Sequence, residues 1–161
     1  MAYALTHKDV DKMNRVLHEL LQHSESLGCL ACDNSGYVLA QRGVDAQDPL
    51  LISALGAGVF AASRELARLL GEDKFSSVFH QGEQKSIFIC AVNTDVLLVD
   101  IFSNEASVGL VKLYAVPAAT ALRGVLAEVT EREETVGIPE HSFVLNTETS
   151  DVFASKSVNS G

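Results

Sequence analysis

Apolar residues recur at intervals of three and four in three stretches of the chain, and this spacing is typical of helices with one buried face. The predicted helices cover 6–24, 49–70 and 108–131. Thr6 and Asp48 precede the first two helices, and their side-chain oxygens suit an N-cap, where they accept hydrogen bonds from backbone N–H groups of the first turn. Pro117 lies inside the third stretch, where we expect it to kink or split the helix.

Five shorter runs are apolar, rich in β-branched or aromatic residues and bounded by polar turns, which predicts strands. They cover 28–33, 37–41, 75–81, 86–92 and 95–102. The turn Asn34-Ser35-Gly36 joins the first two strands as a hairpin. The order is therefore helix, two strands, helix, three strands, helix (α-β-β-α-β-β-β-α). It predicts an α/β (α+β) fold with a five-stranded antiparallel sheet flanked by helices.

The second predicted helix carries two stripes of different size. The large apolar residues form one stripe, which we expect to face the core: Ile52, Leu55, Val59, Ala62, Leu66 and Leu69. The small residues form the other: Ala54, Ala57, Gly58 and Ala61. Glycine inside a helix costs about 1 kcal/mol relative to alanine, so Gly56 and Gly58 require an explanation. Either another chain approaches the helix closely, or the glycines pack against the chain's own sheet.

Length and charge narrow the class of protein. The chain has 161 residues, which is typical of one domain, and we expect that domain to cover 1–136. The stretch 137–161 is rich in Ser, Thr, Asn and Asp and is predicted to be a disordered tail. The net charge of −9 argues against binding to nucleic acid. We find no signal peptide and no apolar run long enough to span a membrane, which predicts a cytoplasmic protein.

The sequence offers no motif of a catalytic, metal or cofactor site. The P-loop motif G-x-x-x-x-G-K-[ST] and the nucleophile motif G-x-S-x-G are absent, and the five histidines lack the spacing of metal ligands. Cys29 and Cys32 form a C-x-x-C, but no second pair completes a zinc site. Three steps along a strand place these two side chains on opposite faces. We expect buried thiols, no metal, no cofactor and no catalysis by the chain alone.

Several phrases, in the same order as the predicted elements, resemble the Roadblock/LC7 family. They lie in the hairpin, the second helix, the third and fifth strands and the start of the third helix, at 31–39, 58–72, 75–83, 97–102 and 110–113. The resemblance covers about residues 8–133. Within the family, the chain is most similar to a bacterial branch that works with a Ras-like GTPase of the MglA type.

The resemblance implies a profilin-like fold and a homodimer in which the second helices pair antiparallel and the third strands join two sheets. The positions it assigns to the dimer interface are Ser53, Gly56, Phe60, Phe75, Ser77, Phe79 and Gln81. A GTPase would sit across the paired second helices. The positions assigned to it are Ala54, Ala57, Gly58, Ala61, Arg64, Glu65 and Arg68. Ala61 and Glu65 are the best candidates for direct contact, although Glu65 stands where the family tends to have a small residue.

The function implied is a homodimeric regulator that stimulates GTP hydrolysis by the small GTPase without supplying a catalytic residue, in bacterial cell polarity or motility. Such a protein is cytoplasmic and can be recruited to a cell pole. One alternative is a Roadblock scaffold of a signalling or motor complex that does not activate a GTPase. A second alternative is a ligand-sensing domain, because profilin-like sheets also contain small-molecule pockets.

Overall fold

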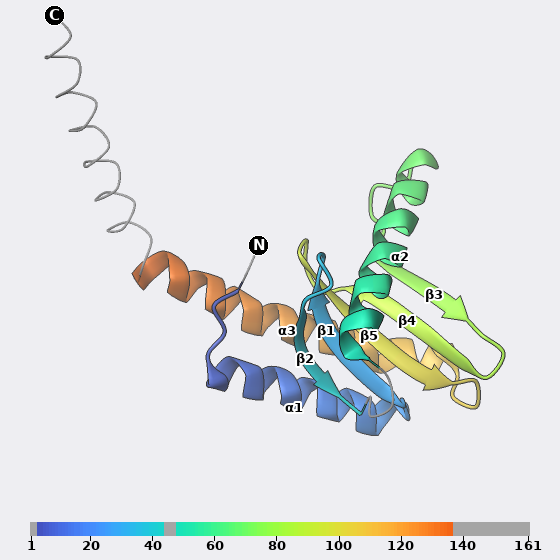
Figure 1. The fold of residues 1–161 in the computed structure, drawn as a ribbon, viewed down its shortest axis with the longest axis horizontal. Helices are drawn as coiled ribbons and strands as arrows, with labels where there is room; N and C mark the ends of the chain where they lie inside the picture. Colours follow the sequence, from blue (N-terminus) through green and yellow to red (C-terminus); the bar gives the residue numbers. More distant parts are fainter. Residues whose placement is uncertain (1–2, 44–47, 137–161) are drawn as a thin grey trace, which may run out of the picture.

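A five-stranded antiparallel sheet forms the centre of the fold and has helices on both faces (Figure 1). The computed structural model describes residues 3–43 and 48–136. Across the sheet the strands follow the order β2-β1-β5-β4-β3, so β2 and β3 are the two edges. Along the chain the elements are α1 (His7–Ser24), β1 (Gly28–Asp33), β2 (Val38–Arg42), α2 (Pro49–Leu69), β3 (Ser77–Gln81), β4 (Lys85–Ala91), β5 (Val96–Ser103) and α3 (Val108–Val136).

The predicted element order and the antiparallel sheet are confirmed. α3 continues through Pro117, so the helix is not split there, and a kink at this residue stays a prediction. The backbone N–H that proline lacks would have bonded the carbonyl of Leu113, on the exposed side of the helix, where water can bond that oxygen instead. The predicted tail at 137–161 lies outside the described residues, and the domain boundary at 136 stays a prediction.

The start of α1 is held by the two residues that the sequence suggested. Thr6 accepts a hydrogen bond from the backbone N–H of Asp9, and the Asp9 carboxylate accepts one from the backbone N–H of Thr6, which completes a capping box. Arg132, near the end of α3, donates to the same carboxylate at 2.6 Å. The guanidinium and the Thr6 N–H hold the pKa of Asp9 well below its usual range. The start of α1 is thereby tied to the end of α3.

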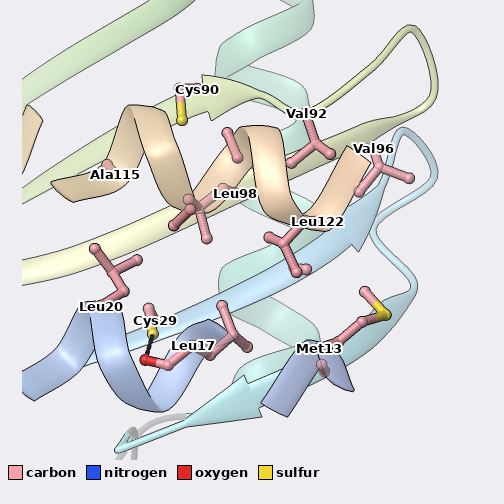
Figure 2. Close-up of a cluster of buried hydrophobic side chains, with 14 of the residues drawn as sticks. Met13, Leu17, Leu20, Cys29, Cys90, Val92, Val96, Leu98, Ala115 and Leu122 are labelled. Atoms are coloured by element: carbon pink, nitrogen blue, oxygen red, sulfur yellow. Dashed lines mark hydrogen bonds between the residues drawn. The ribbon is translucent and has the colours of Figure 1, made fainter. Parts of the chain in front are cut away.

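The larger core lies between the sheet and the α1–α3 pair (Figure 2). Met13, Leu17 and Leu20 reach into it from α1, and Leu98 faces them from β5. The apolar residues that recur at helical spacing along α3 are buried: Val111, Ala115, Ala118, Leu122, Val125, Leu126 and Val129. This face of the sheet is therefore fully covered near β1 and β5.

A smaller core lies on the opposite face of the sheet, beneath α2. The side chains of Cys29 and Cys32 point to opposite faces of β1, as predicted. Cys29 packs in the larger core, where its thiol donates to the carbonyl of Leu17, and Cys32 packs beneath α2. Burial raises the pKa of the Cys32 and Cys90 thiols to about 12 and that of Cys29 as well. All three thiols are free and stay protonated at neutral pH, so they lack the thiolate form that redox and metal chemistry needs.

Candidate functional site

The outward face of α2 is the most unusual surface of the described chain. The residues that α2 buries are Ser53, Gly56, Ala57, Phe60 and Ala67. The large apolar stripe was expected to point inward, and this expectation is wrong except at Ile52, which is half-buried and packs on the smaller core. Leu55, Leu66 and Leu69 are 62%, 60% and 79% exposed, and Val59 is also exposed. We call the exposed large residues Leu50, Leu51, Leu55, Val59, Leu66, Leu69 and Leu70 the apolar ridge.

Apart from Phe60, the inward residues of α2 are small, because the helix lies close to a sheet whose own side chains fill much of the space. A Cβ atom added at Gly56 would lie 3.6 Å from Val99 Cγ2 and 3.7 Å from Ile89 Cδ1, which is ordinary contact distance. The hairpin turn holds the start of the helix equally close. Gly36, at φ +86°, packs against the backbone of Ala54, and the Ser53 hydroxyl donates to the Gly36 carbonyl. The first two turns of α2 therefore bury only small residues, whereas Phe60, one turn further on, packs on Phe75.

The small stripe of α2 divides between the two sides of the helix. Ala57 is buried against the sheet, whereas Ala54, Gly58 and Ala61 are exposed. A Cβ atom at Gly58 would have nothing within 4 Å. Gly56 is therefore buried against the chain's own sheet, where an alanine methyl would also fit, and Gly58 is exposed to solvent. The exposed small residues lie beside the apolar ridge. The outward surface of α2 is therefore low where side chains are small and protrudes where they are leucines.

Three of the positions assigned to the dimer interface lie under α2 rather than on its surface. Ser53, Gly56 and Phe60 are buried within the subunit, so they cannot touch a second chain directly unless the helix moves. Phe75 is half-buried, and its ring packs on Phe60 with the centroids 5.2 Å apart. These residues position the helix and the strand that follows it.

The other dimer positions lie on β3, which forms an open edge of the sheet. Within the described chain β3 pairs with β4 alone, so one side of its backbone is free to pair. Gln81 is exposed, Ser77 is half-buried, and Phe79 is 40% exposed while its ring stacks on Phe102. An unpaired strand edge is a ready template for another strand. In Figure 1 this edge and α2 lie on the same side of the molecule.

The charged positions on α2 sit beyond the small stripe. Arg68 and Glu65 form an exposed ion pair of 2.8 Å one turn apart, and such a pair contributes little to stability. Arg64 lines a hollow at the end of the sheet, together with Phe60 and Phe75. The three charges therefore lie toward the C-terminal end of α2, next to the exposed residues Leu66 and Leu69.

The described residues give this surface no chemistry of its own. In the described ranges no three His, Cys, Asp or Glu side chains come together as metal ligands. Both α2 and α3 are long and apolar enough to cross a membrane by length and composition, which the sequence analysis did not anticipate. Each of them packs one face on the sheet, as helices of a folded domain do. The arrangement suits association with another protein.

Comparison with known proteins identifies the fold. Residues 12–102 match the Roadblock/LC7 domain. The chain belongs to the Roadblock/LC7 family. The gliding protein MglB of Thermus thermophilus is 30% identical, with a TM-score of 0.74, over 79% of this chain and 97% of that one. MglB of Myxococcus xanthus is 29% identical, with a TM-score of 0.72, over 78% and 96% of the two chains.

The Roadblock/LC7 fold of this chain is also profilin-like. Profilin IA of Acanthamoeba castellanii covers 69% of this chain and 96% of its own length, with a TM-score of 0.51 and 12% identity, which supports the fold alone. Sequence reasoning found the small stripe of this Roadblock domain but missed the apolar ridge. The available signal was that α2 is apolar almost all round, which is unusual for a helix that covers one face of a sheet.

Proposed function

We propose that this Roadblock/LC7 protein is a homodimeric regulator that binds a Ras-like GTPase of the MglA type and stimulates its GTP hydrolysis. The observation that carries the proposal is the apolar, exposed face of α2 beside the open edge of β3. Contiguous apolar surface of this kind marks an interaction site in soluble proteins. The likeness to MglB supports the choice of partner class.

The dimer rests on the apolar ridge and the β3 edge together. Covering a fully exposed leucine is favourable by roughly 1.5–3 kcal/mol. The ridge has five leucines that are more than half exposed near its two ends, namely Leu50, Leu51, Leu66, Leu69 and Leu70. Their burial by a second copy offsets an association cost of about 4–15 kcal/mol. Pairing of β3 with its symmetry mate would satisfy the free backbone groups and join the two sheets.

The GTPase would bind the small stripe. Ala54, Gly58 and Ala61 expose little more than backbone, so a partner can approach the helix closely, and the Glu65–Arg68 pair and Arg64 form a charged border. Ala57 is buried against the sheet, so it supports the exposed small residues from beneath and does not contact the GTPase itself. Small central residues with a charged border combine close packing with orientation of the partner.

Stimulation would come from the GTPase's own catalytic groups. An inserted arginine accelerates some GTPases by 10³–10⁵, but several arginines of this chain have structural roles. Arg132 is paired with Asp9, Arg68 with Glu65, and the Arg123 Nε donates to the carbonyl of Val92 at 2.6 Å. Binding that favours the active arrangement of the GTPase shifts its population toward that state, which accelerates hydrolysis without a new catalytic residue.

The test is a GTP-hydrolysis assay with the cognate MglA-type GTPase, combined with a mass measurement. We expect the parent to be dimeric and to accelerate hydrolysis. Ala61→Arg should abolish GTPase binding or split the dimer without unfolding the subunit, because it places a long charged side chain in the small stripe. Ala127→Arg, at an exposed alanine of α3, is the matched control and should behave as the parent does.

The outcomes separate activator from scaffold. Acceleration that Ala61→Arg removes supports the proposal. Binding without acceleration reduces the protein to a scaffold, and an unchanged mass and affinity in Ala61→Arg would show that the interface is elsewhere. A fluorescent fusion tests the cellular part of the proposal, since a regulator of polarity should be cytoplasmic and gather at a cell pole.

A further inference from the structure

A groove of about 260 Å³ runs beside α3, on the face of the sheet opposite α2. Phe88 and Cys90 of β4 form its floor. One wall is a stripe of α3 with steps of four, three and four residues, and the opposite wall is the start of β3. The stripe consists of Lys112, Val116, Ala119 and Arg123. Val116 is 58% exposed, so the centre of the groove presents an apolar surface to solvent.

Each end of the groove carries a cation. The Lys112 ammonium lies 5.8 Å from the centre of the Phe88 ring. The Arg123 guanidinium is fixed at the other end by the hydrogen bond from its Nε to the carbonyl of Val92. A second hollow, of about 510 Å³, meets the groove at Arg123 and Ser76 and adds Arg64 from α2.

The charge of these two hollows contrasts with the charge of the chain. Among the described residues that line them there are three cations and no carboxylate. The chain as a whole has 21 acidic and 12 basic residues. A site that concentrates cations in an acidic protein selects an anionic ligand, and the apolar floor between the cations selects one that also carries apolar groups.

We propose that this groove binds an extended, acidic peptide segment of a partner protein. Lys112 and Arg123 are eleven residues apart, which is about 16 Å along a helix axis. An extended chain advances about 3.3 Å per residue, so five residues span this distance. The two acidic residues of the segment therefore lie four or six positions apart, because an even spacing keeps both side chains on the same face of an extended chain. Apolar residues between them pack on Val116 and the floor.

The groove shares only its margin with the proposed interfaces, since Ser77 is also assigned to the dimer and Arg64, in the adjoining hollow, to the GTPase. Pairing at β3 would extend the sheet in its own plane, whereas the groove lies above the sheet on the α3 side, so a dimer leaves it accessible. The acidic peptide would thus be a second partner, bound at the same time as a GTPase. Each charge-assisted hydrogen bond is worth roughly 1.5–3 kcal/mol, so loss of one cation should weaken binding about tenfold to a hundredfold.

The test measures fluorescence polarisation of a labelled nine-residue peptide with two glutamates six positions apart and valines and alanines elsewhere. A second peptide has glutamines in place of the glutamates. We expect the parent protein to bind the glutamate peptide at least tenfold more tightly, and to bind it less tightly as salt is raised. Arg123→Gln and Lys112→Gln should each weaken binding at least tenfold. Lys8→Gln, at an exposed lysine of α1, should have no effect.

Three results would overturn the proposal. They are equal binding of the two peptides, undiminished binding by both groove variants, and binding of inorganic phosphate as tight as that of the glutamate peptide, which would mark a small-anion site. Arg123→Gln removes a structural hydrogen bond, so the fold of this variant is checked by circular dichroism. If Arg123→Gln is unfolded, the peptide affinity of Lys112→Gln decides the question. Ala61→Arg should retain peptide binding. Loss there would assign the peptide to the α2 surface.

Discussion

Asp100 is a buried carboxyl group whose ionisation should destabilise the fold. It lies on β5, fully inaccessible to solvent, opposite Cys29 on one neighbouring strand and Phe88 on the other. Neither carboxylate oxygen has a hydrogen-bond partner within the described chain. The Ser26 hydroxyl, bonded to that of Ser24, is near enough to lower the pKa slightly but forms no hydrogen bond with either oxygen. Burial dominates and raises the pKa of Asp100 from 3.8 to about 7.

The sign and size of the effect follow from linkage. Because the folded pKa is above the unfolded one, the folded state holds more protons between these values, and stability falls as pH rises through this window. A shift of about three units corresponds to roughly 4 kcal/mol, at 1.36 kcal/mol per unit. About 3 kcal/mol of this loss falls between pH 5 and pH 8. That is a large part of the 5–15 kcal/mol typical of a domain.

Asp100→Asn removes the titration and nearly preserves the shape. We expect the free energy of unfolding of the variant, relative to the parent, to increase by roughly 3 kcal/mol from pH 5 to pH 8. Urea unfolding followed by circular dichroism at both pH values measures this change. Asp11→Asn, at an exposed aspartate of α1, should show no such change. If the difference between Asp100→Asn and the parent is equal at pH 5 and pH 8, the carboxyl is not desolvated as described.

Three further changes test the fold and the interface. Gly36→Ala should lower the free energy of unfolding by roughly 2 kcal/mol or more, because positive φ and a clash with α2 both oppose it; Gly71→Ala, with a similar φ but open surroundings, should cost only about 1 kcal/mol in the same urea titration. Leu66→Gln should change subunit stability by less than about 0.5 kcal/mol but weaken the dimer in analytical ultracentrifugation, and a large loss of subunit stability would contradict its exposed position. Arg132→Gln should cost about 1–2 kcal/mol at pH 7. Because the folded pKa of Asp9 is depressed, that stability is present above pH 4 and lost as pH falls, so the variant should lose less on acidification.

Local signals in the sequence were sufficient for the elements and their order. The Thr6–Asp9 capping box, the Asp48 cap and the Asn34-Ser35-Gly36 turn each act within a few residues, and the structure contains all three. The inward positions of α3 were predictable as well, because a single apolar stripe leaves one choice of buried face. The site required more than such local information.

The orientation of α2 could not be read from its spacing. Helical spacing shows which residues share a stripe, but α2 has apolar residues on several stripes, so its buried face depends on the room that the sheet leaves. Leu30, Leu97 and Val99 already fill the space beneath α2. Besides Phe60, the sheet therefore buries the small residues of the helix, and the leucines that a hydrophobicity rule would bury stay exposed.

The sequence left open whether Gly56 and Gly58 of α2 face the chain's own sheet or another chain, and the two residues differ in this respect. Gly56 is buried against the chain's own sheet, so no second chain reaches it, and a methyl group there would make ordinary contacts with Val99 and Ile89. Gly58 has open space around it, and its cost of about 1 kcal/mol is not recovered by any contact within the described subunit. Close approach of another backbone in an assembly would explain why position 58 is a glycine, although glycine weakens the isolated helix. Gly58→Ala should therefore stabilise the subunit while it weakens the association proposed at the small stripe, and a gain in both would remove this argument for a partner.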